Sequence, residues 1–170
     1  MNRPAAGTSE LIKAVPLTAE DFAPFGEILA PFPGRKPDAN EAEFSFTTAA
    51  LPKDLTDDAM LANLVCKPRN FVLRKLERHN DTPEMLAAMD GDSLLCAAPP
   101  SADPAACGPG DITAVRINRG QAVLLRPGTW HWIPFPLLDK PSLFLLMFRD
   151  KTGENDLEIM DLRKEFSIGL

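Results

Sequence analysis

The sequence has little of what marks secreted, membrane-spanning or nucleic-acid-binding proteins. It holds three cysteines in 170 residues, none in CxxC spacing, which argues against a disulfide framework or a zinc knuckle. No apolar run approaches the roughly 20 residues that span a bilayer, and residues 1–10 lack a signal-peptide pattern. Basic residues number 18 against 24 acidic ones, which disfavours duplex DNA or an anionic membrane as partner. We therefore expect a soluble protein of the cytoplasm.

What is present suits one globular domain spanning residues 1–170. The hydrophobic fraction of 45% is ordinary for a folded protein and too high for a disordered one. Prolines (17) and glycines (10) are spread along the whole chain. Because proline is excluded from helix interiors and central strands, such frequent interruption favours many short elements joined by turns. The composition predicts a mainly-β barrel with one or two short helices.

Local patterns place the elements. Thr18 is a good helix N-cap with Asp21 three residues later, Phe22 and Phe25 form an apolar face, and Gly26 is placed to end this helix of about two turns. Residues 53–65 are ambiguous between a loop and a weak helix, and the charged tail from residue 153 predicts one helix or an edge strand. Strands are predicted over residues 27–30, 43–48, 71–79, 93–98, 111–117, 121–125 and 142–149.

The chain has only two histidines, and acidic residues stand near the first of them. Glu77 and His79 are two residues apart in a predicted strand, so their side chains point to the same side. Glu84 follows shortly after, and His131 ends a Pro-Gly-Thr-Trp-His segment. Ionised groups inside a barrel are rarely left there unless they are paired or bind a metal. From the residues alone, two interpretations of this group stay open: a hydrogen-bonded network and a metal site.

The spacing resembles the two motifs of the cupin superfamily. E-x-H-x4-E-x6-G runs from Glu77 to Gly91, with Glu77 replacing the usual first histidine, and P-G-x-x-H runs from Pro127 to His131. The resemblance implies a cupin-like double-stranded β-helix, a jelly-roll barrel, with no organic cofactor. Two imidazoles and two carboxylates suit Mn, Fe, Ni or Zn. The metal ligands that the resemblance implies are Glu77, His79, Glu84 and His131.

Four further residues near the motifs are candidates for substrate binding. Arg78 and Arg126 are rival clamps for a carboxylate, because the guanidinium fork pairs with both oxygens. A salt bridge on the outer face is the alternative for Arg78. Trp130 and Trp132 either line the barrel mouth or pack in the core. The isolated cysteines are expected to be buried and unreactive.

A second resemblance covers most of the chain. The segment LTAEDFAPFGEIL at 17–29, LERH at 76–79 and N-x-G-Q…GTWH at 118–131 are similar to the ureidoglycolate lyase family, also called ureidoglycolate hydrolase. The resemblance implies a homodimeric cupin-like barrel that converts ureidoglycolate to glyoxylate and urea in purine and allantoin breakdown. His79, His131 and Glu77 would carry catalysis on this small carboxylate substrate.

The chain also departs from that family. Trp132 stands where the family has a second histidine, and Leu124 lies in a stretch that has lost an amide. Pro127 replaces a basic residue, whereas Glu84 replaces a frequent glutamine and restores a cupin-type ligand. These changes predict a divergent member. Two alternatives stay open: another metal-dependent cupin enzyme acting on a small hydroxy or keto acid, and a non-catalytic cupin that binds a small ligand.

Overall fold

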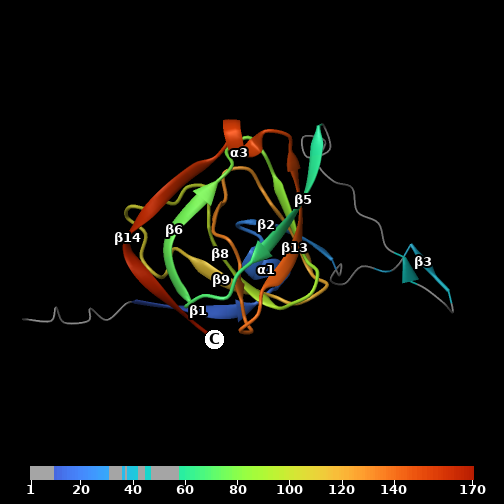
Figure 1. The fold of residues 1–170 in the computed structure, drawn as a ribbon, viewed down its shortest axis with the longest axis horizontal. Helices are drawn as coiled ribbons and strands as arrows, with labels where there is room; N and C mark the ends of the chain where they lie inside the picture. Colours follow the sequence, from blue (N-terminus) through green and yellow to red (C-terminus); the bar gives the residue numbers. More distant parts are fainter. Residues whose placement is uncertain (1–9, 31–35, 37, 42–44, 47–57) are drawn as a thin grey trace, which may run out of the picture.

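The regular structure of the described residues consists mainly of β-strands (Figure 1). The computed structural model describes residues 10–30, 36, 38–41, 45–46 and 58–170. Within these residues the only helices are α1 (Ala19–Phe22) and α3 (Thr152–Asn155), of four residues each. The predicted mainly-β barrel with one or two short helices is confirmed. No helix in this part of the chain is both long enough and apolar enough to cross a membrane.

The larger sheet has seven strands and closes on itself. Its order is β11-β6-β14-β1-β9-β8-β12, and β11 pairs with β8 as well as with β6, so the order returns to its start. Closure gives backbone partners to strands that would otherwise be open edges. The strands of the larger sheet are β1 (Glu10–Pro16), β6 (Val72–Arg78), β8 (Ser93–Ala98), β9 (Thr113–Ile117), β11 (Trp130–His131), β12 (Phe135–Pro136) and β14 (Glu158–Gly169).

The smaller sheet has five antiparallel strands in the order β2-β10-β7-β13-β5. Two short strands, β3 (Ala39–Asn40) and β4 (Ser45–Phe46), pair only with each other. The remainder of the strand predicted at 43–48 lies outside the described residues. The strands of the smaller sheet are β2 (Gly26–Ala30), β5 (Ala59–Cys66), β7 (Glu84–Ala88), β10 (Ala122–Leu125) and β13 (Ser142–Arg149).

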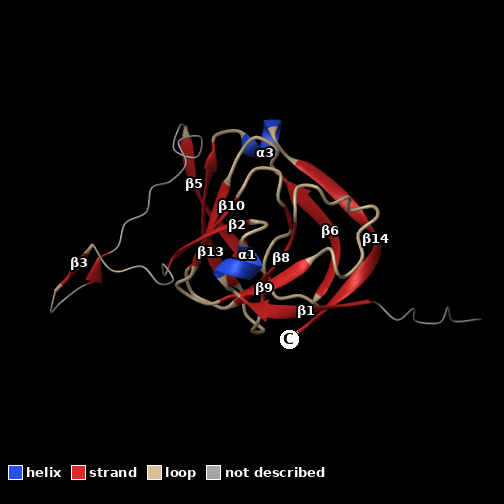
Figure 2. Ribbon diagram, turned by 180° about the vertical axis from the view of Figure 1, so that it is seen from behind, coloured by secondary structure: helices blue, strands red, loops and turns tan. Residues whose placement is uncertain are grey.

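The described residues form two large hydrophobic cores and one small cluster, made of Leu29, Ala122 and Leu124. The ring core lies inside the closed larger sheet and includes Leu76, Leu94 and Trp130. The inter-sheet core joins residues of both sheets, among them Leu95 and Phe144. Leu94 and Leu95 are neighbours in β8 yet pack in different cores, because successive side chains of a strand point to opposite faces. Each fully buried side chain of this kind contributes about 1.5–3 kcal/mol. In Figure 1, and from behind in Figure 2, β6 and β14 lie across the barrel from β5 and β13.

The N-terminal helix is shorter than predicted. The hydroxyl of Thr18 caps it by accepting from the Asp21 backbone N–H at 3.1 Å, as the sequence indicated. The helix ends after one turn, and Gly26 begins β2 instead of closing the helix. Glycine is required there because an added Cβ would lie 1.8 Å from the Leu124 carbonyl oxygen. Its role is close approach between β2 and β10.

Two ambiguous segments are strands. The segment 53–65 was ambiguous between a loop and a weak helix; residues 53–57 lie outside the described residues, and the rest belongs mostly to β5, which pairs with β13 over its whole length. Pairing with a distant strand determines the conformation of this segment, because its residues have no clear preference of their own for helix or strand. The tail forms both α3 and β14, and β14 is no edge strand: it lies between β6 and β1. Five of the described strands were not predicted from sequence: β1, β3, β7, β11 and β12.

The alternation predicted for residues 71–79 holds only in part. Leu73 and Leu76 both pack in the ring core although they are three residues apart. The partner strand β14 is irregular at this point, where its register shifts between Asp161 and Phe166. An irregularity of this kind redirects side chains locally, which a strict period of two cannot anticipate.

Candidate active site

Four polar side chains meet between the two sheets. His131 in β11 is paired in register with Glu77 in β6, and His79 follows the end of β6. The neighbours of this pair in the chain, Leu76 and Trp130, pack in the ring core. Alternation therefore turns Glu77 and His131 away from that core, toward the smaller sheet.

The fourth side chain comes from the smaller sheet. Glu84 is the first residue of β7, and its face of that strand also carries Leu86, which packs in the inter-sheet core. No strand was predicted at this position. The cluster therefore needs both sheets to form, and it lies at one end of the inter-sheet core.

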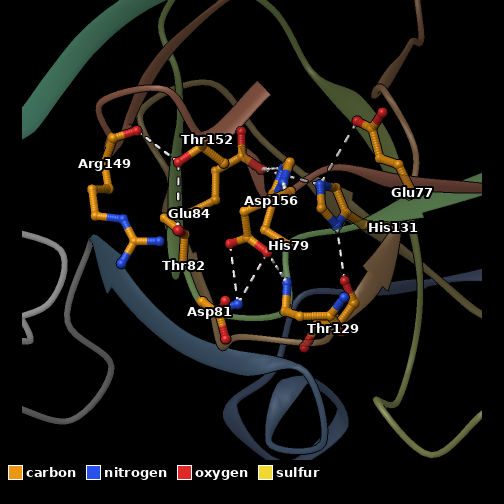
Figure 3. Close-up of polar contacts among 11 residues, drawn as sticks. Glu77, His79, Asp81, Thr82, Glu84, Thr129, His131, Arg149, Thr152 and Asp156 are labelled. Carbon is orange, nitrogen blue, oxygen red and sulfur yellow. Dashed lines mark hydrogen bonds and ion pairs between the residues drawn. The ribbon is translucent and has the colours of Figure 1, made fainter. Parts of the chain in front are cut away.

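The carboxylate of Glu84 is the centre of the cluster. Its Oε2 lies 3.0 Å from Nε2 of His131 and 3.5 Å from Nε2 of His79. Oε1 of Glu77 is farther away, 3.9 Å from Nε2 of His131 (Figure 3). Side-chain exposure is 5% for His131, 10% for Glu84, 11% for His79 and 19% for Glu77. Solvent therefore reaches the cluster mainly beside Glu77.

Backbone carbonyls fix the tautomer of both histidines. Nδ1 of His79 lies 2.7 Å from the Asp156 carbonyl oxygen, and Nδ1 of His131 lies 3.0 Å from that of Thr129. A carbonyl oxygen can only accept, so Nδ1 of each ring donates to it; the Glu84 carboxylate likewise only accepts, so a second proton lies on Nε2, facing Glu84, whenever the ring is protonated. Both Nε2 atoms are then left to face Glu84.

The four groups shift one another's protonation. Burial alone raises the pKa of Glu84, but His131 and then His79 outweigh it and lower that pKa to about 2. Burial lowers the pKa of each histidine, and the nearby carboxylate of Glu84 outweighs it and raises the pKa. The pKa of Glu77 is raised, first by burial and then by the charge of Glu84, against the opposing influence of His131. Glu84 is thus the permanent anion, and Glu77 is the carboxyl that takes up a proton more readily.

The donor set fits a metal ion. In the described part of the chain, Glu84 Oε2 is buried without a well-aligned hydrogen bond, although a carboxylate oxygen in such a place normally has one. This oxygen and the imidazole nitrogens of His79 and His131 lie within 4.8 Å of one another. Metal-binding histidines typically donate their other N–H to a backbone carbonyl, as both do here. Two imidazole nitrogens and one carboxylate oxygen are common ligands of Mn, Fe, Ni and Zn.

The predicted substrate-binding residues make their contacts elsewhere. Arg78 donates to Glu158 at 2.7 Å and stacks on the Trp130 ring, whose centroid is 4.3 Å away. A salt bridge was the alternative named above for Arg78, but the contact with Trp130 places this one beside the ring core and not on the outer face. Arg126 donates to the Ala23 carbonyl oxygen at 2.6 Å, which turns it toward α1. The structure does not bring either guanidinium into the cluster.

The two tryptophans differ in exposure. Trp130 is buried in the ring core, and its indole N–H donates to the Ala102 carbonyl oxygen at 3.0 Å. Trp132 is half-buried at the edge of the same core, with the ammonium of Lys75 4.9 Å from its ring centroid. The three cysteines are free and buried, and burial raises the pKa of the Cys66 thiol to about 11. These thiols are protonated and unreactive at neutral pH, as predicted.

Sequence reasoning missed three residues around the cluster. Thr129 and Asp156 hold the histidines through backbone carbonyls, and any residue type supplies a carbonyl, so no residue pattern announces them. Lys75 carried a usable signal, because it stands two residues before Glu77 in the same predicted strand. Its positive charge is one of those that oppose the effect of burial on Glu77.

Comparison of the sequence with known proteins gives one family. A family model described as ureidoglycolate lyase matches residues 9–169. A curated protein of Stutzerimonas stutzeri (strain A1501), named ureidoglycolate lyase, is 29% identical, and the match covers 82% of this chain and 84% of that protein.

Comparison of the fold gives more distant neighbours. An oxalate decarboxylase of Lactobacillus farciminis has a TM-score of 0.43 and 16% identity, covering 62% of this chain and 27% of its own. RmlC of Streptococcus suis has a TM-score of 0.42 and 13% identity, covering 58% of this chain and 48% of its own. This chain thus spans about a quarter of the first neighbour and half of the second. The closed barrel with a second sheet packed against it confirms the predicted mainly-β barrel.

Proposed function

Because the chain belongs to the ureidoglycolate lyase family, we propose that it cleaves ureidoglycolate to glyoxylate and urea at the cluster of His79, Glu84 and His131. The observation that carries the proposal is the geometry of the cluster. Two imidazole nitrogens converge on one buried carboxylate, and a second carboxyl, Glu77, stands on the more exposed side. Such a site offers a place for a cation and a separate group for proton transfer.

The reaction moves one proton and breaks one bond. Ureidoglycolate carries a hydroxyl, a carboxylate and a urea nitrogen on one carbon. Loss of the hydroxyl proton lets the C–O bond become the carbonyl of glyoxylate, while the C–N bond breaks and its electron pair stays on nitrogen. That nitrogen takes a proton and leaves as urea. The site therefore has to accept a proton at oxygen and supply one at nitrogen.

His79, Glu84 and His131 would hold the metal ion. When bound, a cation of the Mn, Fe, Ni or Zn type supplies Lewis-acid polarisation of the substrate's hydroxyl and carboxylate oxygens. The backbone contacts of the histidines keep both Nε2 atoms free for this role. The hydrogen bonds to the carbonyl oxygens of Thr129 and Asp156 orient the rings and are supplied by the chain itself.

Glu77 is the proposed proton carrier. It is the most exposed of the four side chains, so a substrate approaching from solvent meets it first. Its raised pKa brings the carboxyl closer to neutrality, where a general acid–base group is most effective. Glu77 takes the hydroxyl proton and returns it to the urea nitrogen, so it ends the cycle unchanged.

Lys75 is the proposed partner of the substrate carboxylate. It is half-buried against Trp132 and acts on Glu77 through its charge, whereas Arg78 and Arg126 are engaged elsewhere. A charge-assisted hydrogen bond contributes about 1.5–3 kcal/mol, or roughly 10- to 100-fold in affinity. Lys75→Met is therefore expected to raise KM for ureidoglycolate at least about tenfold, with a smaller change in kcat.

A matched control for Lys75 is Lys164, which pairs with Glu10 on the surface and lies over the Phe166 ring. Lys164→Met removes the same charge from a similar aromatic contact, far from Glu77 in the fold. KM and kcat of both variants are compared by steady-state kinetics. Equal KM values in the two variants would remove Lys75 from substrate binding.

The activity itself is tested by measuring glyoxylate and urea released from ureidoglycolate by the purified chain. We expect both products in equal amounts, at a rate far above that of the spontaneous reaction. A small hydroxy or keto acid turned over in place of ureidoglycolate would establish another enzyme of this fold. Saturable stabilisation by glyoxylate-like acids, without turnover of any substrate, would establish a binding protein.

We further propose that the enzyme works in the cytoplasm as a homodimer. The free, buried cysteines suit a reducing compartment, and the dimer is what the family resemblance implies. Light scattering of the purified chain gives the oligomeric state directly.

A further inference from the structure

Asp156 connects the end of the chain to the turn that carries His79. It lies between α3 and β14 and is 7% exposed. Its carboxylate accepts from the Asn80 backbone N–H at 2.7 Å and from that of Asp81 at 3.1 and 3.2 Å. Its own carbonyl oxygen lies 2.7 Å from Nδ1 of His79. One residue thus binds three consecutive residues located some 75 positions earlier in the chain.

The turn of α3 is itself fixed to the barrel. The Asp156 backbone N–H donates to the Thr152 carbonyl oxygen at 2.9 Å. The buried hydroxyl of Thr152 donates to the Arg149 carbonyl oxygen at 2.6 Å and lies 3.4 Å from that of Thr82 (Figure 3). The carbonyl that faces His79 is thus held from the side of α3 by these contacts, and from the side of residues 80 and 81 by the Asp156 carboxylate.

The two histidines differ in how far along the chain the carbonyl that holds each ring lies. The carbonyl that fixes His131 belongs to Thr129, two residues away, and is carried by the same short stretch of chain. The carbonyl that fixes His79 is 77 residues away. Loss of the Asp156 carboxylate should therefore loosen one imidazole and leave the other in place.

We propose that Asp156 is a positioning residue that holds His79 in the Nδ1–H tautomer and aims its Nε2 at Glu84. It acts on the reaction only through His79, and it would act in the same way on any metal held by the cluster. The activity part of this inference rests on the proposed lyase function, whereas the tautomer part does not.

The chain is well suited to a direct test, because His79 and His131 are its only histidines. In untagged, metal-free protein with ¹⁵N-labelled histidine, the imidazole nitrogens give just two sets of signals, assigned with a His79→Gln variant. Recorded above the titration of each ring, the wild-type spectrum is expected to show the Nδ1–H form for both. In Asp156→Ala, the His79 signals should move to a mixture of tautomers, and the His131 signals should stay.

Two further variants separate positioning from general destabilisation. Asp92→Ala removes a carboxylate that likewise accepts a backbone N–H, from Arg119, in a surface turn, and both histidine signals should be unchanged. Asp156→Asn keeps one acceptor oxygen and should give an intermediate shift of the His79 signals. This variant also tests the proposal if the alanine variant does not fold.

Activity and metal binding give the second readout. A residue that orients a metal ligand typically contributes 10- to 100-fold, so kcat/KM and Mn²⁺ affinity should each fall by about that factor in Asp156→Ala and less in Asp156→Asn. A folded variant, Asp156→Ala or Asp156→Asn, in which His79 keeps the pure Nδ1–H signal would overturn the proposal. If the wild type has no lyase activity and Asp156→Ala still shifts only the His79 signals, the proposed function is refuted and the positioning role remains.

Discussion

His131→Gln is expected to lower kcat/KM for ureidoglycolate by about 10³-fold, the size typical of losing a central catalytic group. The imidazole of His131 lies closer to Glu84 than that of His79, and it is the least exposed side chain of the cluster. Without it, Glu84 keeps one imidazole partner, its pKa rises, and the convergent donor set is lost. Glutamine is close in size and still has an amide N–H for the Thr129 carbonyl, so the barrel should fold.

The control for this prediction is Glu165→Gln, which removes an exposed surface ion pair with Arg74. Exposed pairs contribute about 0–1 kcal/mol to stability, so this variant should have wild-type kinetics and a similar melting temperature. Turnover, circular dichroism and thermal unfolding are compared for the three proteins. Near-normal turnover in folded His131→Gln would remove this histidine from the mechanism.

Exhaustive chelation is expected to reduce glyoxylate release to background, and addition of Mn, Ni, Fe or Zn to restore it. The basis is the buried Oε2 of Glu84, which has two imidazole nitrogens near it and no well-aligned hydrogen bond among the described residues. A bound ion stabilises the folded state by mass action, so the melting temperature should fall on chelation as well. Elemental analysis before and after treatment gives the stoichiometry.

His131→Gln serves again as the comparison, because it removes one of the three proposed ligands. Its metal content after reconstitution should be well below that of the wild type. Full activity in protein shown by elemental analysis to be free of metal would contradict the metal site. The lyase would then operate with Glu77 and the histidines as acid–base groups alone.

The cluster could be predicted because it follows from spacing within short segments. Glu77 and His79 share a face by the period of a strand, and the motifs place Glu84 and His131 beside them. Of the four predicted ligands, the structure groups three around one point and sets Glu77 somewhat apart. The barrel was likewise predictable from the distribution of proline and glycine.

Long-range pairing accounts for what could not be predicted. The strand β5 has no local preference for its conformation and acquires one from β13. Asp156 reads as one acid in a charged tail until the chain brings it to the turn after β6. Arginine near a motif suggests a clamp, yet Arg78 and Arg126 found partners that only the folded chain provides.

The place where the larger sheet closes, here called its seam, has a consequence for local opening of the fold. The larger sheet closes through β11, a strand of two residues, and one of those two is His131. So short a strand contributes few backbone hydrogen bonds, and because both of its side chains are buried, packing is what holds it against a local opening. Each such opening separates His131 from Glu77 and Glu84 at the same moment as it parts β6 from β8. Closing the barrel and assembling the active site are therefore a single event, and the fraction of time for which the seam is shut sets an upper limit on the fraction of molecules ready to react.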